Sequence, residues 1–181
     1  MNAYTVYKMI YDTVTKGEDG LYHVRAFTDE RKKVFVQLNN VKIVDVSEDL
    51  AFEPADFTKV DAVHDLNIQN AVENGEIWFG RKVTDKTIKS AYIRDDTISA
   101  ERIGNTKVFN ADKEVVDFET IEVGSECSVI VEFSGLWFAK KAFGPAWNIV
   151  QVKINRPNEP EPEPEKFDET YPDDYMFEDD Q

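Results

Sequence analysis

The distribution of charge divides this chain into two parts, and only one of them is suited to fold. The last 25 residues, 157–181, carry eleven carboxylates against one lysine and so hold −10 of the formal net charge of −15. A segment this acidic repels itself and buries little apolar surface. Its alternating Glu-Pro start favours an extended polyproline II spacer. The sequence therefore predicts a folded domain over residues 1–155 and a disordered Pro/Glu-rich acidic tail over residues 156–181.

The remaining 156 residues have a nearly balanced charge, with 25 acidic and 20 basic side chains. This length suits one domain with a sizeable core. No stretch approaches the roughly 18 to 20 apolar residues that span a bilayer, and the N-terminal residues lack the basic-then-apolar pattern of a signal peptide. A single cysteine, Cys127, excludes an internal disulfide, and its apolar neighbours predict a buried thiol. These features predict a soluble, intracellular protein.

Short β-branched and aromatic runs separated by turn residues predict a β-rich fold. In the run 33–46, Val34, Val36 and Leu38 share one face, whereas Val41 and Ile43 have the opposite parity, so we expect a bulge near residues 39–40. Thr84 is suited to cap a short helix that ends near residue 93, and residues 55–74 are ambiguous but partly helical in pattern. This pattern favours an antiparallel barrel or sandwich. The other predicted strands are 4–15, 21–27, 106–109, 115–121, 128–133, 136–138 and 147–154.

Residues for catalysis or metal binding are scarce in this sequence. The two histidines, His23 and His64, are not paired with a carboxylate or a nucleophile in any recognised motif. One cysteine and two distant histidines do not make a zinc signature, and no glycine-rich phosphate loop or EF-hand spacing is present. We therefore expect no enzymatic activity, no metal and no cofactor.

The segment 134–154, SGLWFAKKAFGPAWNIVQVKI, interleaves aromatic and basic side chains. In its last run, Val150, Val152 and Ile154 share one face, which leaves Trp147, Gln151 and Lys153 on the other. An outward tryptophan beside a lysine suits single-stranded nucleic acid, because the ring stacks on a base and the ammonium meets a phosphate. Aromatic residues of β-proteins also fill cores, so Trp147 remains open between an exposed and a buried position.

This segment resembles the late hairpin of the single-stranded DNA-binding proteins of large nucleocytoplasmic DNA viruses, which are related to the phage-T7-type proteins. The resemblance is specific over residues 129–154 and general elsewhere. It implies a mainly β OB-fold antiparallel barrel with a short helix, a basic and aromatic groove for DNA, and homodimerisation. It also implies an acidic tail that competes for the groove and docks replication proteins. The phage members end on an aromatic residue, whereas here four residues follow Phe177.

The sequence and the resemblance together predict sequence-independent binding of single-stranded DNA in viral DNA replication, recombination or repair. The residues expected to contact DNA are aromatic or basic: Trp78, Arg81, Lys82, Lys86, Lys89, Arg94, Trp137, Lys140, Lys141, Trp147 and Lys153. Partners such as a polymerase, helicase or primase are expected to bind the tail through Asp173, Asp174, Tyr175, Phe177, Glu178, Asp179 and Asp180. Two alternatives remain: a protein-interaction module whose acidic tail binds basic partners without DNA, and a structural virion or scaffold protein.

Overall fold

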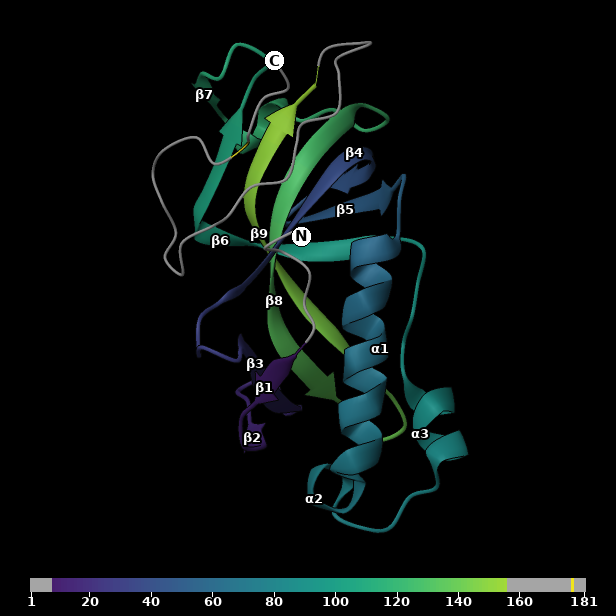
Figure 1. Ribbon diagram of the computed structural model, residues 1–181. Helices are drawn as coiled ribbons and strands as arrows, with labels where there is room; N and C mark the ends of the chain where they lie inside the picture. The colour runs from purple at the N-terminus through teal and green to yellow at the C-terminus, as the bar shows by residue number, and fades with distance from the viewer. Residues whose placement is uncertain (1–7, 156–176, 178–181) are drawn as a thin grey trace.

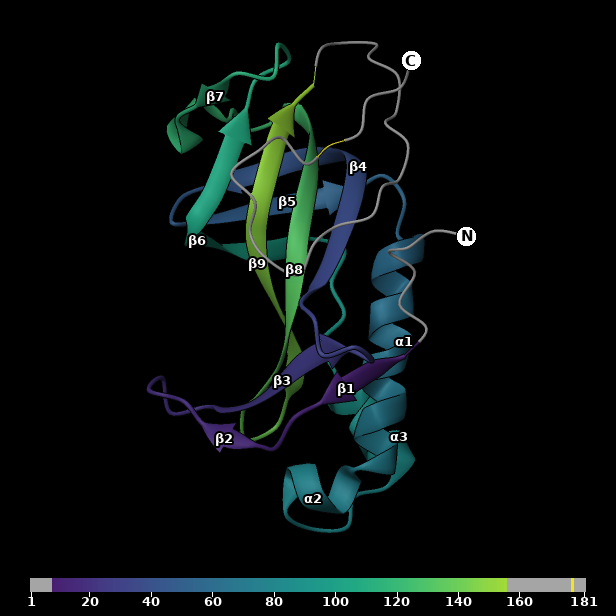
Figure 2. The ribbon, with the colours of Figure 1, turned by 60° about the vertical axis from the view of Figure 1, so that its left-hand side comes forward.

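Residues 8–155 and Phe177 are described by the computed structural model of this protein (Figures 1 and 2). The strands are β1 (Met9–Tyr11), β2 (Thr15–Lys16), β3 (Tyr22–Thr28), β4 (Val34–Val46), β5 (Asp49–Pro54), β6 (Ile98–Phe109), β7 (Val115–Val116), β8 (Glu126–Phe138) and β9 (Phe143–Ile154). The helices are α1 (Thr58–Glu73), α2 (Gly75–Phe79), α3 (Asp85–Ala91) and the short 3-10 helix η1 (Phe118–Thr120).

Five strands close a barrel with OB-fold connectivity. β4, β5 and β6 form an antiparallel meander, β8 pairs with β4, and β9 pairs with β8. The ring closes where β9 runs parallel to β6, the one parallel pairing between strands of the described residues. Closure leaves no free edge within the ring. The expected mainly β OB-fold is confirmed, and β1, β2 and β3 extend its sheet beyond β8.

The bulge expected at residues 39–40 is present in β4. The register between β4 and β8 shifts between Leu38 and Val41, and Asn40 adopts a positive φ of 57°, a conformation that asparagine tolerates better than most residues. The extra residue restores the inward direction of Val41 and Ile43, both of which are buried. The bulge therefore bends β4 around the barrel while both halves of the strand face the core.

The three α-helices lie between β5 and β6 in the chain and cover one end of the molecule. The ambiguous segment 55–74 contains the 16-residue α1, so the sequence reading of a single short helix was incomplete. The predicted cap of α3 is confirmed, since Thr84 Oγ1 accepts a hydrogen bond from the Thr87 backbone N–H at 3.2 Å. Figure 1 shows α2 at the opposite end of the molecule from β7, close to the tip of the long β8–β9 hairpin.

An aromatic cluster joins α2 to the tip of this hairpin. Phe79 lies edge-on to Phe138 and Phe143, with ring centroids 5.6 and 5.4 Å away, and Phe138 stacks on Phe143. The predicted strands 128–133 and 136–138 form the single strand β8. The hairpin is therefore one continuous pair of strands, whose tip packs against α2.

Some sequence expectations concern what is buried or absent. Cys127 is fully buried, as expected, and burial raises the pKa of its thiol to about 11. No group of three or more metal-ligating side chains occurs among the described residues. Within residues 8–155, no helix is long and apolar enough to cross a membrane.

Candidate nucleic-acid interface

The outer face of β4, β8 and β9 is the first part of the candidate interface. Strand register places Phe35 opposite Glu132, and Gln37 opposite Ile130. On the other side of β8, Lys153 lies opposite Ser128. These side chains point away from the core formed by their neighbours Val129, Val131 and Val152. The closed barrel thus brings residues from three distant segments onto one surface.

An apolar cluster lies at the centre of this outer face. It consists of Phe35, Ile130, Val150 and Phe177, each at most 6 % exposed. Phe177 belongs to the acidic tail, and it is the one tail residue that the structure describes. The tail's aromatic ring therefore packs on the outside of the barrel, as a separate cluster from the main core.

Polar groups surround this apolar cluster. Gln37 is fully buried, and its Oε1 atom has no hydrogen-bond partner among the described residues, although its Nε2 donates to Asn39 Oδ1 at 3.0 Å. A buried carbonyl oxygen without a donor is costly. It marks a place where a ligand N–H would be favourable.

Several lysines lie on or beside the same face. Lys153 lies on it and is buried, with an exposed fraction of 2 %. Lys107 of β6 lies opposite Gln151 of β9. The Nζ atom of Lys59 donates to the Gln37 carbonyl oxygen at 2.8 Å, and Lys33 lies 3.8 Å from Glu132. The ammonium groups make this face suited to an anionic ligand.

The tip of the β8–β9 hairpin forms the second part. Trp137 is half-buried and lies opposite Gly144, where an added Cβ would come within 3.0 Å of the indole. The absence of a side chain at Gly144 leaves room for the ring against β9, beside Ile93. Lys140 and Lys141 are exposed in the connecting turn. A flat tryptophan next to two free ammonium groups suits base stacking and phosphate contact.

Other predicted residues gather around α2. Trp78, Arg81 and Lys140 line one pocket of about 610 Å³, so the structure brings the hairpin turn together with the distant segment around α2. The Trp78 ring is only 8 % exposed and packs at 5.4 Å from Tyr11. Trp78 therefore forms a wall of this pocket and presents little of its face.

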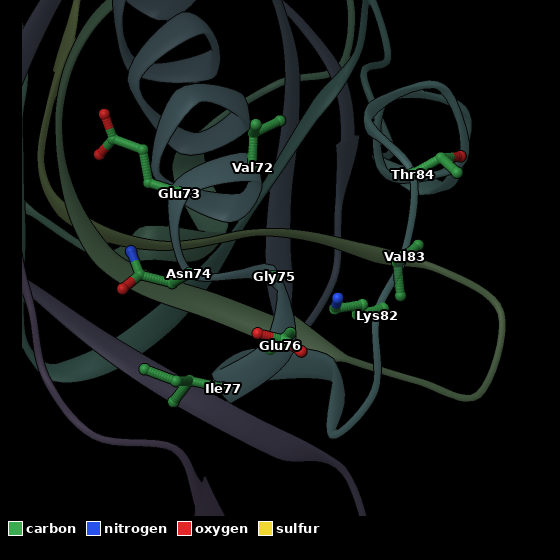
Figure 3. A pocket seen from close by; sticks show the side chains of 9 residues that line it. All are labelled: Val72, Glu73, Asn74, Gly75, Glu76, Ile77, Lys82, Val83 and Thr84. Carbon is green, nitrogen blue, oxygen red and sulfur yellow. The ribbon is translucent and has the colours of Figure 1, made fainter.

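The basic residues near α3 divide into two groups. Lys86 and Lys89 are exposed on the helix. Lys82 is exposed as well, but it lines a pocket of about 470 Å³ together with Glu73 and Glu76 (Figure 3). The mixed charge of this pocket makes it a poor site for a polyanion.

Arg94 is engaged within the protein. Its guanidinium lies 3.0 Å from Asp61 and 3.6 Å from Asp65 of α1, and these partners, Asp61 above all, raise its pKa. The geometry indicates a contact that ties the segment between α3 and β6 to α1. A phosphate would have to compete with two carboxylates at this position.

Strand alternation grouped Trp147 with the outward residues Gln151 and Lys153, and this orientation is wrong for Trp147. Of the two positions that the sequence left open, the buried one is observed. Trp147 is 6 % exposed and belongs to the core, with its ring 5.4 Å from that of Phe133. The register of β9 shifts between Ile149 and Gln151, which leaves Val150 as an extra residue opposite β8. This bulge reverses the alternation, so that Trp147 points inward while Gln151 and Lys153 point outward, and Val150 joins the outer cluster.

The surface of β5 and β6, where many OB-folds bind oligonucleotides, is acidic here. It carries Asp49 and Glu53 on β5 and Glu101 on β6, and Asp49 lies directly opposite Glu101. A nucleic acid would meet like charge on this surface. The charges therefore favour the outer face of β4, β8 and β9.

Sequence reasoning missed the strand residues in the apolar cluster and the polar residue beside it. Phe35, Gln37 and Ile130 look like ordinary strand residues, and only their opposite parity to the core positions distinguishes them. The predicted tail residues other than Phe177 lie outside the described residues. They are Asp173, Asp174, Tyr175, Glu178, Asp179 and Asp180.

The barrel and its connectivity place this chain among OB-fold proteins, and similar solved structures agree. A single-stranded DNA-binding protein from bacteriophage Enc34, in a C-terminally truncated form, matches with a TM-score of 0.50 and 16 % identity, covering 83 % of this chain and 95 % of that chain. The same phage protein in complex with ssDNA matches with a TM-score of 0.49 and 15 % identity over 85 % of this chain and 98 % of that chain. At this identity the similarity concerns the fold.

The sequence matches a family of unknown function (DUF5871) over residues 39–179, and the protein belongs to this family. The matched segment begins at the β4 bulge and includes Phe177. No match was found among curated proteins. The finer resemblance to phage-T7-type proteins and to those of large DNA viruses stays a prediction.

Proposed function

We propose that this protein binds single-stranded DNA without sequence preference, along the outer face of β4, β8 and β9 and the hairpin tip. The observation that carries the proposal is the position of Phe177, an aromatic ring from a polyanionic segment, in the cluster with Phe35, Ile130 and Val150. Single-stranded DNA has the same chemistry, since it is a polyanion that carries flat rings. A face that accepts one such ligand is suited to the other.

Each part of the surface has a role in this proposal. Trp137 stacks on a base, and Lys140, Lys141 and Lys153 meet phosphates. A base that replaces the Phe177 ring covers the apolar cluster, and one of its N–H groups, an exocyclic amino group or the ring N3–H of thymine, supplies the donor that Gln37 Oε1 lacks. None of these contacts depends on base identity alone, which fits binding without sequence preference.

The tail then competes with DNA for this face. A tethered segment has an effective concentration that reaches the millimolar range for short linkers, so weak contacts by the tail are enough to oppose weak contacts by DNA. A long strand displaces the tail and exposes its acidic residues, including Asp173, Asp174 and Glu178, to replication proteins. On this proposal, the tail becomes accessible to replication proteins only when DNA is bound.

Two further points support the proposal. The similar phage structures have the same fold and are described as single-stranded DNA-binding proteins, which agrees with a non-enzymatic role in replication, recombination or repair. The chain contains no predicted catalytic motif. A homodimer and a location at sites of viral DNA replication belong to the same proposal.

The test measures the affinity of the full chain for labelled oligo(dT) at two salt concentrations. We expect Phe177→Ala, or deletion of residues 157–181, to tighten binding, because the competing ring or the whole tail is removed. Phe167→Ala is the matched control, since it removes a ring from the same tail but leaves Phe177 in place. Equal affinity of all three full-length chains at low salt would refute the competition.

The same titration separates DNA binding from the protein-interaction alternative. Trp137 is the half-buried tryptophan, so stacking predicts salt-sensitive quenching of its fluorescence. If the full chain and the chain lacking residues 157–181 both fail to bind oligo(dT), the barrel is not a DNA-binding domain. The acidic tail would then be the functional part.

A further inference from the structure

A stretch of β8 separates the two parts of the candidate interface. Ile130 of the outer-face cluster and Trp137 of the hairpin tip are seven residues apart on this strand, about 23 Å at 3.3 Å per residue. A DNA strand that reaches both must cross this stretch. In Figure 2, β3 lies beside β8 between the barrel and the hairpin tip, and the two strands are paired there. The side chains of β3 therefore belong to the surface that such a strand meets.

The alternation of β3 places Arg25 on the same side of the sheet as Trp137. Val24 and Ala26 are buried in the core, so their neighbours in β3 face the other way. His23 is paired with Trp137, and Arg25 follows two residues later, about 7 Å along the strand. Arg25 is also exposed. It is thus an outward cation one step from the ring that is expected to stack on a base.

The Phe27 ring holds the guanidinium group of Arg25. The Cζ atom of Arg25 lies over this ring, 5.5 Å from its centroid, within the range of a cation–π contact. A guanidinium that is already held loses less freedom when it binds a ligand. Its planar fork of N–H donors matches the oxygens of a phosphate. Arg25 and Phe27 together therefore form a preorganised phosphate-binding group.

The charge of Arg25 is not neutralised by the described part of the chain. Arg25 forms no ion pair with another described residue, whereas two carboxylates of the same surface have partners. Asp19 lies 3.1 Å from His23, and Glu132 accepts a hydrogen bond from Asn148 Nδ2 at 3.2 Å. The guanidinium is therefore available to an anionic ligand.

We propose that Arg25, positioned by Phe27, binds the phosphate of the nucleotide whose base stacks on Trp137. Since β3 and β8 are antiparallel, Phe27 lies on the side of Arg25 nearer to Ile130, so the strand continues from this phosphate toward the outer-face cluster. The contact joins the hairpin tip and the outer face in one DNA path. It rests on the proposed function, and it makes β3, a strand outside the barrel, part of the DNA-binding surface.

Salt-dependent titration of labelled oligo(dT) into the full chain tests the contact. Arg25→Gln should weaken binding about tenfold at low salt and lower the log–log slope by about 0.7, the value of one phosphate. Arg25→Lys should keep the slope and recover only part of the affinity, because an ammonium has the charge without the fork. Phe27→Leu should weaken binding about two- to fivefold with an unchanged slope, since it removes the support of the guanidinium but not its charge.

Arg102→Gln is the matched control. Arg102 also lies over a phenylalanine ring, 4.3 Å from the centroid of Phe118, but its guanidinium is paired with Glu119 at 2.9 Å. This variant should change neither the affinity nor the slope. Urea unfolding of every variant separates an effect on DNA binding from a loss of stability.

A double variant tests whether one nucleotide contacts both side chains. Arg25→Gln combined with Trp137→Ala should weaken binding by less than the product of the two separate fold-changes, because residues that share a ligand group are coupled. A loss equal to the product would place the phosphate at Arg25 away from the base at Trp137 and would overturn the proposed path.

The titration also separates failure of this contact from failure of the proposed function. If the wild-type chain binds oligo(dT) and Arg25→Gln keeps both its affinity and its slope, Arg25 does not contact DNA and the proposed function stands. Tighter binding by Arg25→Gln would assign the arginine to the acidic tail and would equally overturn the contact. Absence of binding by the wild-type chain would instead refute the proposed function itself.

Discussion

The Nδ1 atom of His64 lies 2.5 Å from the hydroxyl oxygen of Tyr92, in a buried contact between α1 and the segment that follows α3. Asn67 Nδ2 donates to the same hydroxyl at 2.9 Å, and the Tyr11 hydroxyl donates to Asn67 Oδ1 at 2.6 Å. Since Tyr92 accepts from Asn67, its own proton is directed to His64. The chain of hydrogen bonds therefore requires a neutral His64 and ties α1 to both β1 and the barrel.

Stability should decrease as the pH falls from about 6.5 to about 4. Burial is the main cause that lowers the pKa of His64 from 6.5 to about 4 in the folded protein. Between these values the unfolded chain binds a proton that the folded protein excludes, so the free energy of unfolding drops by up to about 1.4 kcal/mol per pH unit. Urea unfolding at pH 7, 5.5 and 4.5 measures this slope.

His23 provides the control for this prediction, because it is partly exposed and lies 3.1 Å from Asp19 at the surface. His23→Gln should retain the decrease between pH 6.5 and 4.5, whereas His64→Gln should lose most of it. A wild-type stability that stays constant over this range would contradict the buried, neutral state of His64.

Trp147→Ala should destabilise the fold by about 3–5 kcal/mol, as for other large aromatic residues in cores. The reason is the packing of its ring against Phe133 inside the barrel. Chemical denaturation measures the change, and Trp147→Phe, which keeps a ring in the core, should cost less. A stable Trp147→Ala variant with reduced DNA binding would instead support the outward orientation.

The two bulges explain why one part of the fold could be predicted and the other could not. In β4 the bulge falls on two polar residues, 39 and 40, between apolar residues of opposite parity, so the sequence itself shows the change of face. In β9 it falls on Val150, directly after Ile149, and the alternation of Val150, Val152 and Ile154 with polar residues gives no sign of it. Alternation alone therefore assigned Trp147 to the wrong face.

The candidate site was predictable at the hairpin tip and hidden on the outer face. Trp137, Lys140 and Lys141 are close in sequence, so their interleaving is visible without a fold. Phe35, Ile130 and Phe177 become neighbours only through the closure of the barrel and the return of the tail. Contacts of this range depend on tertiary packing, which local patterns do not specify.

Trp137→Ala should weaken binding to oligo(dT) by about 1–3 kcal/mol, the usual value of one stacked base. Its ring is half-buried, so the loss of stability should be smaller than for Trp147→Ala. Gly144→Ala tests the same ring without removing it, because the new Cβ approaches the indole to 3.0 Å and displaces it. Fluorescence anisotropy of a labelled oligonucleotide measures both variants, and unchanged affinity in both would exclude Trp137 from the interface.

Replacing both Lys140 and Lys141 by alanine should reduce the dependence of DNA affinity on salt. Each phosphate contact contributes about 0.7 to the log–log slope for single strands, so the double variant should lose about 1.4. Both side chains are exposed, and the stability should therefore stay the same. Lys113→Ala, an exposed lysine of the turn between β6 and β7, should leave the slope unchanged, and an equal slope in the double variant would remove the β8–β9 turn from the DNA path.

Gly135→Ala should destabilise the protein by more than about 4 kcal/mol or prevent folding. Losses of this size arise from only a few mechanisms, and strain at an unusual backbone conformation is one of them. Gly135 has a φ of 146°, and an added Cβ would meet the Val24 carbonyl oxygen at 2.0 Å and the Arg25 Cα at 2.9 Å. Gly135 of β8 and Arg25 of β3 are paired residues, so the added Cβ would force these two strands apart. Gly104→Ala is the matched control, since nothing lies within 4 Å of its added Cβ. Thermal unfolding compares the two, and similar stability would mean that β3 does not approach β8 this closely in solution.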